Sequence, residues 1–345
     1  MYSVDLSALH FFQKLNVTHD FFCAIPSMRK YGDLYLNYLH SPCQLEEYDI
    51  IVFWGDFTTN PMYGVNEFVR QDMFLRGSSG TKESFARWAS LFLPPDADDG
   101  KTYLSIGQNF QSIRSFLNWP MPAQELCRRY QRFEHIFTRD SYSFDELNDI
   151  LEGMDGRLSL GMDCAFLLNP AVKQPNPRPL VYCSFFGRTR FQNRPAFDHL
   201  LRDRGFESVS VSDWLALREH RPHWQYRKNL ERMRSSSLAV SDTYHFIINA
   251  IMENVPVIGL GEQSAYPRDT LSDFKKDILF KDLDLQDYYF KLSQGVLSDK
   301  TKAEMMEFID SRKFASEWSM RREKISLDIS KFKSALVDAF VTALD

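Results

Sequence analysis

An aspartate and a histidine stand three positions apart at the start of the segment SDTYHFIINAIMENVPVIGLG, residues 241–261. Apolar residues recur behind them at helical spacing, so Ser241 or Asp242 is predicted to cap a helix whose first turn carries His245. The N–H groups and the dipole of a helix N-terminus favour a bound anion and disfavour imidazolium. A neutral His245 could therefore exchange a proton with an anionic ligand. The alternative is that Asp242 only caps the helix and His245 only packs.

Two arginine-bearing segments could hold the phosphate or carboxylate of such a ligand. Arg188 directly follows the predicted strand in LVYCSFFGR, and Arg227 lies in the basic and aromatic segment HRPHWQYRKNLERMR, residues 220–234. Arginine binds phosphate and carboxylate groups through paired hydrogen bonds. The alternative for residues 220–234 is a solvated loop that enters an amphipathic helix.

Polar residues also follow predicted strands in the N-terminal half. In DIIVFWGDF, Gly55 would permit close backbone approach to a ligand, and Asp56 could accept a hydrogen bond from a hydroxyl. Gln108 and Asn109 follow the strand in KTYLSIGQNF, and Arg139 follows the strand in FEHIFTRD. Ordinary turn chemistry, or a surface ion pair at Arg139, would explain these residues without a function.

The elements that must position these residues alternate between short apolar runs and helix-like segments, as in parallel sheets covered by helices. The segment NPAVKQPNPRP, residues 169–179, holds four prolines and predicts an extended linker. We therefore expect an α/β protein with two Rossmann-like domains facing across a cleft, lined by the polar turns at the carboxyl ends of the strands. The expected parts are residues 1–170, a linker over 171–180, a second domain over 181–300, and C-terminal helices over 301–345 with Ile329, Phe332, Leu336 and Phe340 on one apolar face.

Composition restricts the class of function. The 345 residues are 44% hydrophobic and 25% charged with a formal net charge of −5, which is typical of a soluble globular protein and gives no reason to expect general nucleic-acid binding. The five cysteines form no CxxC pair, which favours a reducing cytoplasm and no zinc site. We find no export leader, no membrane-spanning apolar run, no GxGxxG, no GxxxxGK[ST], no HExxH and no GxSxG. A cytoplasmic location is expected.

Taken in order, these segments resemble the polysaccharide pyruvyl transferase family. The matching segments are Gly32-Asp33, YDIIVFWGDF, LSIGQNF, TRDSYSFDEL, LGMDCAFLL, SDTYHFIINAIMENVPVIGL and the lysine-bearing SDFKKDILFKDLDL. The unit between Gly32-Asp33 and the first strand is shorter than in the family, and Asp56 replaces the second glycine of a Gly-Gly turn. Thr243 stands where the common histidine motif has arginine, so SDTYH is closer to the Thr-Asp-Ser-Phe-His variant. Arg188 or the basic segment would then have to hold an anionic donor.

The resemblance implies a fold like that of GT-B glycosyltransferases, with the acceptor on the first domain and the donor on the second. It implies transfer of the pyruvyl group of phosphoenolpyruvate to two hydroxyls of a sugar in a surface-polysaccharide precursor, as a cyclic ketal, with release of phosphate. His245 matches the functional histidine of the family. No metal or organic cofactor is required, and contact with a membrane would come only through a lipid-linked acceptor.

The candidate site follows from the residues and the resemblance together. The catalytic candidates are His245, Asp242 and Asp56, and the substrate-binding candidates are Arg188, Thr243, Ser241, Arg139, Gly55, Gln108, Asn109 and Arg227. Two other functions stay open. A glycosyltransferase that uses a nucleotide sugar would need a carboxylate for the ribose, which Glu262 could supply, and a non-catalytic member would only bind glycans.

Overall fold

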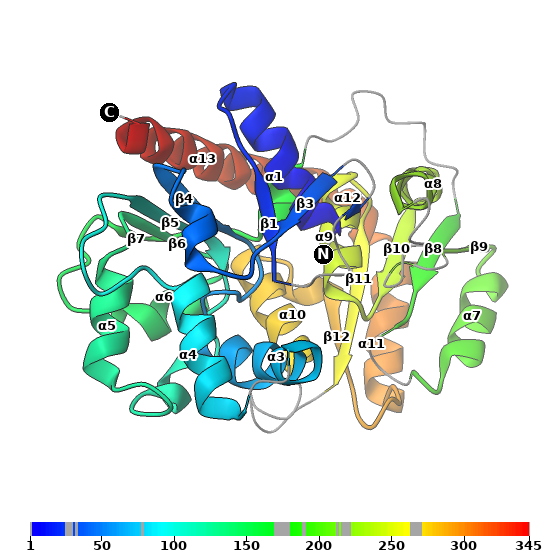
Figure 1. The fold of residues 1–345 in the computed structure, drawn as a ribbon. Helices are drawn as coiled ribbons and strands as arrows, with labels where there is room; N and C mark the ends of the chain where they lie inside the picture. The colour runs from blue at the N-terminus through cyan, green and yellow to red at the C-terminus, as the bar shows by residue number, and fades with distance from the viewer. Residues whose placement is uncertain are drawn as a thin grey trace. The chain divides into compact units, whose positions relative to one another are not determined.

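The structure is a computed structural model in which the chain forms two compact units. It describes residues 2–24, 30–31, 34–76, 79–168, 180–187, 191–211, 214, 222–262 and 271–344. The first unit comprises Met1–Leu167 with Ile329–Asp345, and the second comprises Leu168–Asp328 (Figure 1). The proline-rich segment 169–179 lies outside the described residues, and so does Gly32-Asp33.

The first unit is built on a parallel sheet that the sequence predicted strand by strand. Its order is β4-β5-β6-β7, with bounds Ile50–Trp54, Thr102–Gln108, His135–Thr138 and Leu158–Leu160. Short apolar runs favour such strands because the helices of a parallel sheet bury both of its faces. The helices of this part are α2 (Pro61–Tyr63), α3 (Val69–Arg76), α4 (Thr81–Phe92), α5 (Ala123–Gln131) and α6 (Ser141–Asn148), with a π turn at Gly64–Phe68 between α2 and α3.

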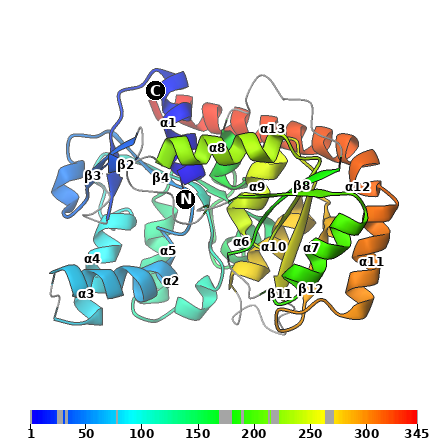
Figure 2. The ribbon, with the colours of Figure 1, turned by 90° about the vertical axis from the view of Figure 1, so that its right-hand side faces the viewer.

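A small second sheet and the two ends of the chain complete the first unit. The small sheet has the order β1-β3-β2, with bounds Phe21–Cys23, Leu34–Tyr38 and Lys30–Tyr31. Helix α1 (Tyr2–Leu15) lies beside the end of α13 (Trp318–Leu344), where the rings of Phe11 and Phe12 lie 5.3 and 5.5 Å from that of Phe340 (Figures 1 and 2). The predicted apolar face of this last helix is confirmed, because Ile329, Phe332, Leu336 and Phe340 are all buried.

The second unit has a five-stranded sheet in which every pairing is parallel. Its order is β12-β11-β10-β8-β9, with bounds Tyr289–Leu292, Val257–Glu262, Leu238–Ser241, Val181–Phe185 and Glu207–Ser210. Strand β8 comes first in the chain but lies inside the sheet. Strand β9 is added on one side of it and β10, β11 and β12 on the other, so the strand order reverses between β8 and β10. At such a topological switch point the connecting turns diverge and leave a crevice at the carboxyl edge of the strands.

Helices cover the sheet of the second unit (Figure 2). They are α7 (Arg194–Asp203), α8 (Pro222–Arg234), α9 (Tyr244–Met252), α10 (Leu271–Asp282), α11 (Asp299–Asp310), α12 (Lys313–Ser316) and the first part of α13. Helix α9 packs on β10 and β11, and α10 packs on β11. The two parallel sheets confirm the predicted α/β class. Among the described residues, no helix has both the length and the apolar character needed to cross a membrane.

Candidate functional site

The turns that follow β8 and β10 are joined by hydrogen bonds at the switch point. The backbone N–H of Gly187 donates to Asp242 Oδ1 at 2.8 Å, and Ser241 Oγ donates to the carbonyl oxygen of Phe185 at 2.6 Å. Ser241 and Asp242 are both fully buried. These two polar side chains therefore hold the carboxyl ends of β8 and β10 together, where a crevice is expected.

The predicted helix cap at Ser241 or Asp242 is wrong. The N-cap of α9 is Thr243, which has extended backbone angles of φ −109° and ψ 119° and makes no side-chain capping hydrogen bond. The Asp242 carboxylate is occupied by Gly187 N–H and by the Thr243 hydroxyl at 3.0 Å, and Ser241 Oγ accepts from Thr243 N–H at 3.0 Å. The first turn of α9 consequently receives no hydrogen bond from the side chain of its N-cap residue, Thr243. A helix N-terminus of this kind can bind an anion through its backbone N–H groups.

His245 is the one side chain in this stretch that reaches the surface. Every other residue from Leu238 to Glu253 is buried, whereas His245 is partly exposed. Its ring meets the ring of Tyr244 edge to face at 5.3 Å, and its backbone carbonyl accepts from Asn249 Nδ2 at 2.6 Å. The geometry places the imidazole in the first turn of α9, as the sequence predicted, where the helix dipole favours its neutral form.

Of the two arginines predicted to bind an anion, the structure describes only Arg227. Arg188 lies outside the described residues. The basic segment forms helix α8 from Pro222 onward, and Arg227 is exposed on it. An open hollow of about 510 Å³ lies over this exposed side and is lined by His223, Trp224, Arg227, Lys228 and Glu231. The Lys228 ammonium lies 4.8 Å from the centre of the Trp224 ring, a cation–π distance.

In the first unit, the turns after β4 and β5 bind each other. Gly55 and Asp56 both have left-handed backbone angles, with φ of 69° and 60°. Asn109 N–H donates to the Asp56 carbonyl at 2.6 Å, and Gln108 Nε2 donates to the Gly55 carbonyl. Gln108 Oε1 also accepts from Thr59 N–H at 3.2 Å. Gln108 is thus fully buried and enclosed by polar partners, while the Asp56 side chain is partly exposed.

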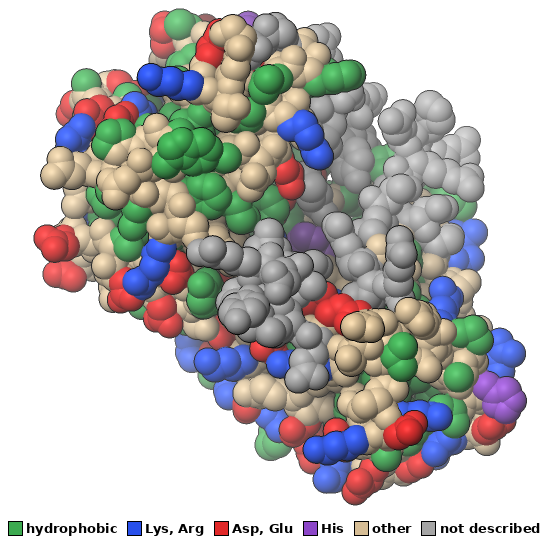
Figure 3. All heavy atoms as spheres, turned by 90° about the horizontal axis from the view of Figure 1, so that it is seen from below, with side chains coloured by type: hydrophobic (Ala, Val, Ile, Leu, Met, Phe, Trp, Pro, Cys, Tyr) green, Lys and Arg blue, Asp and Glu red, His purple; other side chains and the backbone are tan. Residues whose placement is uncertain are grey.

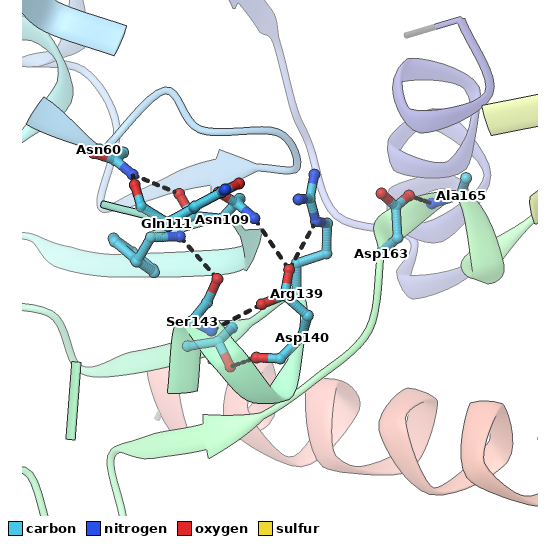
Figure 4. Close-up of polar contacts among 10 residues, drawn as sticks. Asn60, Asn109, Gln111, Arg139, Asp140, Ser143, Asp163 and Ala165 are labelled. Atoms are coloured by element: carbon cyan, nitrogen blue, oxygen red, sulfur yellow. Dashed lines mark hydrogen bonds and ion pairs between the residues drawn. The ribbon is translucent and has the colours of Figure 1, made fainter. Parts of the chain in front are cut away.

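A buried polar cluster follows at the ends of β5 and β6 (Figure 4). Asp140 Oδ2 accepts from Asn109 Nδ2 at 3.0 Å and from Arg139 Nε at 3.3 Å. Asp140 Oδ1 accepts from Ser143 N–H at 2.8 Å and caps α6. Only 4% of Arg139 is exposed, so the surface ion pair considered as an alternative is excluded. The structure therefore brings Asn109 and Arg139 to one carboxylate.

Asp5 is a carboxyl group near the Gly55-Asp56 turn that the sequence patterns did not single out. It lies in the first turn of α1, next to Val4, whose side chain packs directly against the Cα of Gly55. Burial, which the N-terminal charge partly offsets, and to a smaller extent the nearby Asp56 carboxylate together raise the pKa of Asp5 from its ordinary value of 3.8 to about 6. An acidic residue in a first helical turn is ordinarily explained by the helix dipole, which is why Asp5 carried no functional signal in the sequence.

The polar residues of the two units supply no site for a tightly held metal within the described part of the chain. No group of three or more histidine, cysteine, aspartate or glutamate side chains there could hold a metal ion. Acidic and basic side chains are interspersed on the face drawn in Figure 3.

The chain belongs to the polysaccharide pyruvyl transferase family, whose model matches residues 6–264. Membership implies a transferase enzyme and a polysaccharide substrate. The matched residues include the turns after β4, β5, β6, β8 and β10 described above. The comparison with curated proteins found no match.

Several solved structures resemble the fold at low sequence identity. A functionally uncharacterised protein of Klebsiella pneumoniae is 13% identical, with 81% of this chain and 83% of that chain covered and a TM-score of 0.43. A proposed UDP-N-acetylglucosamine 2-epimerase of Listeria monocytogenes is 12% identical, with coverage of 90% and 93% and a TM-score of 0.44. The wall teichoic acid polymerase TagF is 12% identical, with coverage of 84% and 93% and a TM-score of 0.30. No score reaches 0.5, so the assignment rests on the family match.

Proposed function

We propose that the protein transfers the pyruvyl group of phosphoenolpyruvate to a sugar of a surface-polysaccharide precursor in the cytoplasm, forming a cyclic ketal. The observation that carries the proposal is the partly exposed His245 in the first turn of α9, at the switch point of the second unit, within a matched member of the family. The donor's phosphate or carboxylate would bind the N-terminus of α9.

The reaction needs one proton donor and one proton acceptor. Protonation of the methylene carbon of phosphoenolpyruvate makes its central carbon electrophilic, and the first sugar hydroxyl adds there. Phosphate then leaves and the second hydroxyl adds, so the two hydroxyl protons balance the new methyl hydrogen and the proton on phosphate. His245 would exchange a proton with the donor or stabilise its phosphate, because a neutral imidazole can both donate and accept.

The other candidate residues divide between positioning and binding. Buried Asp242, with Ser241 and Thr243, would hold the turn that carries His245, since its carboxylate is engaged by Gly187. Partly exposed Asp56 would accept the proton of a sugar hydroxyl. The remaining binding candidates are Gly55, Gln108, Asn109 and Arg139 for the acceptor, and Arg188 and Arg227 for the anionic donor.

The test is turnover by His245→Gln with phosphoenolpyruvate and an acceptor glycan, followed by phosphate release and by mass spectrometry of the ketal. Loss of a general acid–base group predicts a fall in kcat of about 100- to 10,000-fold. His199→Gln is the matched control, because 76% of the His199 side chain is exposed and it lies on α7. Wild-type turnover in His245→Gln would refute the role of His245, and no ketal from the wild type with any glycan precursor would refute the function.

The nucleotide-sugar alternative rests on Glu262. This residue ends β11 and is partly exposed at the same edge of the sheet as His245, where a carboxylate could bind ribose hydroxyls. Transfer of a sugar from a UDP-sugar, lost in Glu262→Gln and retained in His245→Gln, would favour that function over pyruvyl transfer.

A further inference from the structure

Lys276, on α10, is a lysine with no exposed surface in the second unit. A buried ammonium is costly unless its three N–H donors all find acceptors. Lys276 Nζ donates to the carbonyl oxygens of Asp242 at 2.6 Å and Leu260 at 2.7 Å, and it forms an ion pair with Asp273 Oδ1 at 2.5 Å. Two backbone carbonyl oxygens and one carboxylate oxygen therefore surround the ammonium.

These contacts lie at the carboxyl ends of two neighbouring strands. Asp242 belongs to the turn between β10 and α9, and Leu260 belongs to β11. Lys276 therefore joins the turn after β10 to β11 through a backbone carbonyl oxygen of each. Burial lowers the pKa of Lys276, and the Asp273 carboxylate counteracts part of this effect.

Asp242 is consequently held at both of its polar groups. Its carbonyl oxygen accepts from Lys276, and its carboxylate accepts from Gly187 N–H at 2.8 Å and from the Thr243 hydroxyl at 3.0 Å. The residue at the start of α9 has little freedom to rotate under these constraints. His245 follows within one helical turn, so the direction of the imidazole depends on the same turn.

We propose that Lys276 is a positioning residue of the donor site, which fixes the Asp242 turn and thereby the first turn of α9 that presents His245. The role rests on the function proposed above. Lys276 is not a catalytic residue in this assignment, because its side chain has no exposed surface and its ammonium contacts three oxygen atoms of the protein. Its effect on the donor passes through the backbone of Asp242.

The test removes the contacts of Lys276 with the Asp242 turn and with β11 without leaving an unpaired buried charge. Lys276→Met alone would strand the Asp273 carboxylate and destabilise the unit. The double variant Lys276→Met/Asp273→Asn removes both charges and keeps the side-chain volumes. The matched control is Lys291→Met/Asp277→Asn, which removes an ion pair of 3.1 Å whose side chains are 47% and 48% exposed, with Asp277 on the same helix.

Two measurements report on the turn. Phosphoenolpyruvate binding by calorimetry should weaken roughly 10- to 100-fold in the Lys276 double variant and stay unchanged in the control, as when a supporting contact of a site is lost. Amide hydrogen exchange at Gly187, measured without ligand, should accelerate in the Lys276 double variant only. The change in exchange follows because Asp242 is the acceptor for the Gly187 N–H, and the loss of affinity follows because the Asp242 turn positions the first turn of α9.

The outcomes test the positioning role of Lys276 and the identity of the donor separately. Wild-type phosphoenolpyruvate affinity together with unchanged Gly187 exchange in the Lys276 double variant would overturn the positioning role. A wild-type protein that binds no phosphoenolpyruvate would contradict the proposed donor, and Gly187 exchange would then decide the positioning role alone. Should the Met/Asn variant not fold, Lys276→Gln/Asp273→Asn retains a donor for a backbone carbonyl and should bind with intermediate affinity. If that variant bound phosphoenolpyruvate with wild-type affinity, the full set of Lys276 contacts would not be needed to position the turn.

Discussion

Asp5 and Asp56 place two carboxyl groups at one end of the first unit's sheet. Asp56 is a non-glycine residue with a left-handed backbone, a conformation that costs free energy and that is found in turns and at functional sites. Asp5 keeps its proton to about pH 6 in the folded chain because burial and Asp56 raise its pKa. A carboxyl group with a raised pKa is a candidate proton donor, so Asp5 is a candidate acid beside the proposed acceptor site.

Replacing Asp5 should change how stability depends on pH. The unfolded chain ionises Asp5 near 3.8, whereas the folded chain does so near 6, so the folded state binds the extra proton between these values. The wild type therefore loses stability through this group as pH rises across that window, and Asp5→Asn does not. The free energy of unfolding of Asp5→Asn minus that of the wild type should rise by about 1–3 kcal/mol from about pH 4 to about pH 7.

Urea denaturation across that pH range measures the difference. Asp155→Asn, at an exposed position, is the control and should give a curve parallel to that of the wild type. A constant difference between Asp5→Asn and the wild type over the whole range would show that Asp5 titrates alike in the folded and unfolded chains.

Helix α1 and strand β4 meet at a point where only glycine fits. Gly55 has a φ of 69°, and a Cβ atom there would overlap Val4 Cγ1 of α1. The Trp54 indole N–H also donates to the Val4 carbonyl at 3.2 Å, so a hydrogen bond joins strand and helix next to the glycine. The turn that carries Asp56 is therefore shaped by a helix that is distant in sequence.

Gly55→Ala should destabilise the protein by about 2–4 kcal/mol, since it adds both backbone strain and a clash. Gly153→Ala is the matched control, because Gly153 has a φ of 74° and nothing within 4 Å of the added methyl group. The control should lose only the strain, about 1–2 kcal/mol. Equal losses in the two variants, measured by urea denaturation, would mean that α1 moves to accept the methyl group.

Ligand binding should stabilise the whole chain if the proposed donor is correct. A ligand that binds only the folded state raises the free energy of unfolding by about 2.7 kcal/mol at a hundred times its Kd. Phosphoenolpyruvate should therefore raise Tm, and UDP-sugars should not. The same rise should persist in His245→Ala, with turnover lost, if the imidazole transfers a proton instead of binding the donor. A rise with UDP-sugars alone would remove pyruvyl transfer and favour the Glu262 alternative.

The sequence by itself predicted the strands of the first unit's parallel sheet, the strands β8 to β11 of the second and the α/β class, but neither the small sheet β1-β3-β2 nor β12. The apolar runs at 50–54, 102–108 and 238–241 predicted buried strands because a parallel sheet has no polar face. The family resemblance was also readable from short motifs, and the match over residues 6–264 confirmed it. These features are local, since each depends on neighbours within one strand or one helical turn.

Only the tertiary structure decided which polar atoms meet. Helical spacing predicted Asp242 as a helix cap, but its carboxylate accepts from Gly187 N–H, which is 55 residues away in sequence and reaches it through the pairing of β8 with β10. The resemblance marked the lysine-bearing segment SDFKKDILFKDLDL without singling out Lys276, and only the packing of α10 brings its ammonium to the carbonyl oxygens of Asp242 and Leu260. The order of the strands, and with it the switch point beside His245, follows from long-range packing, which no local pattern encodes.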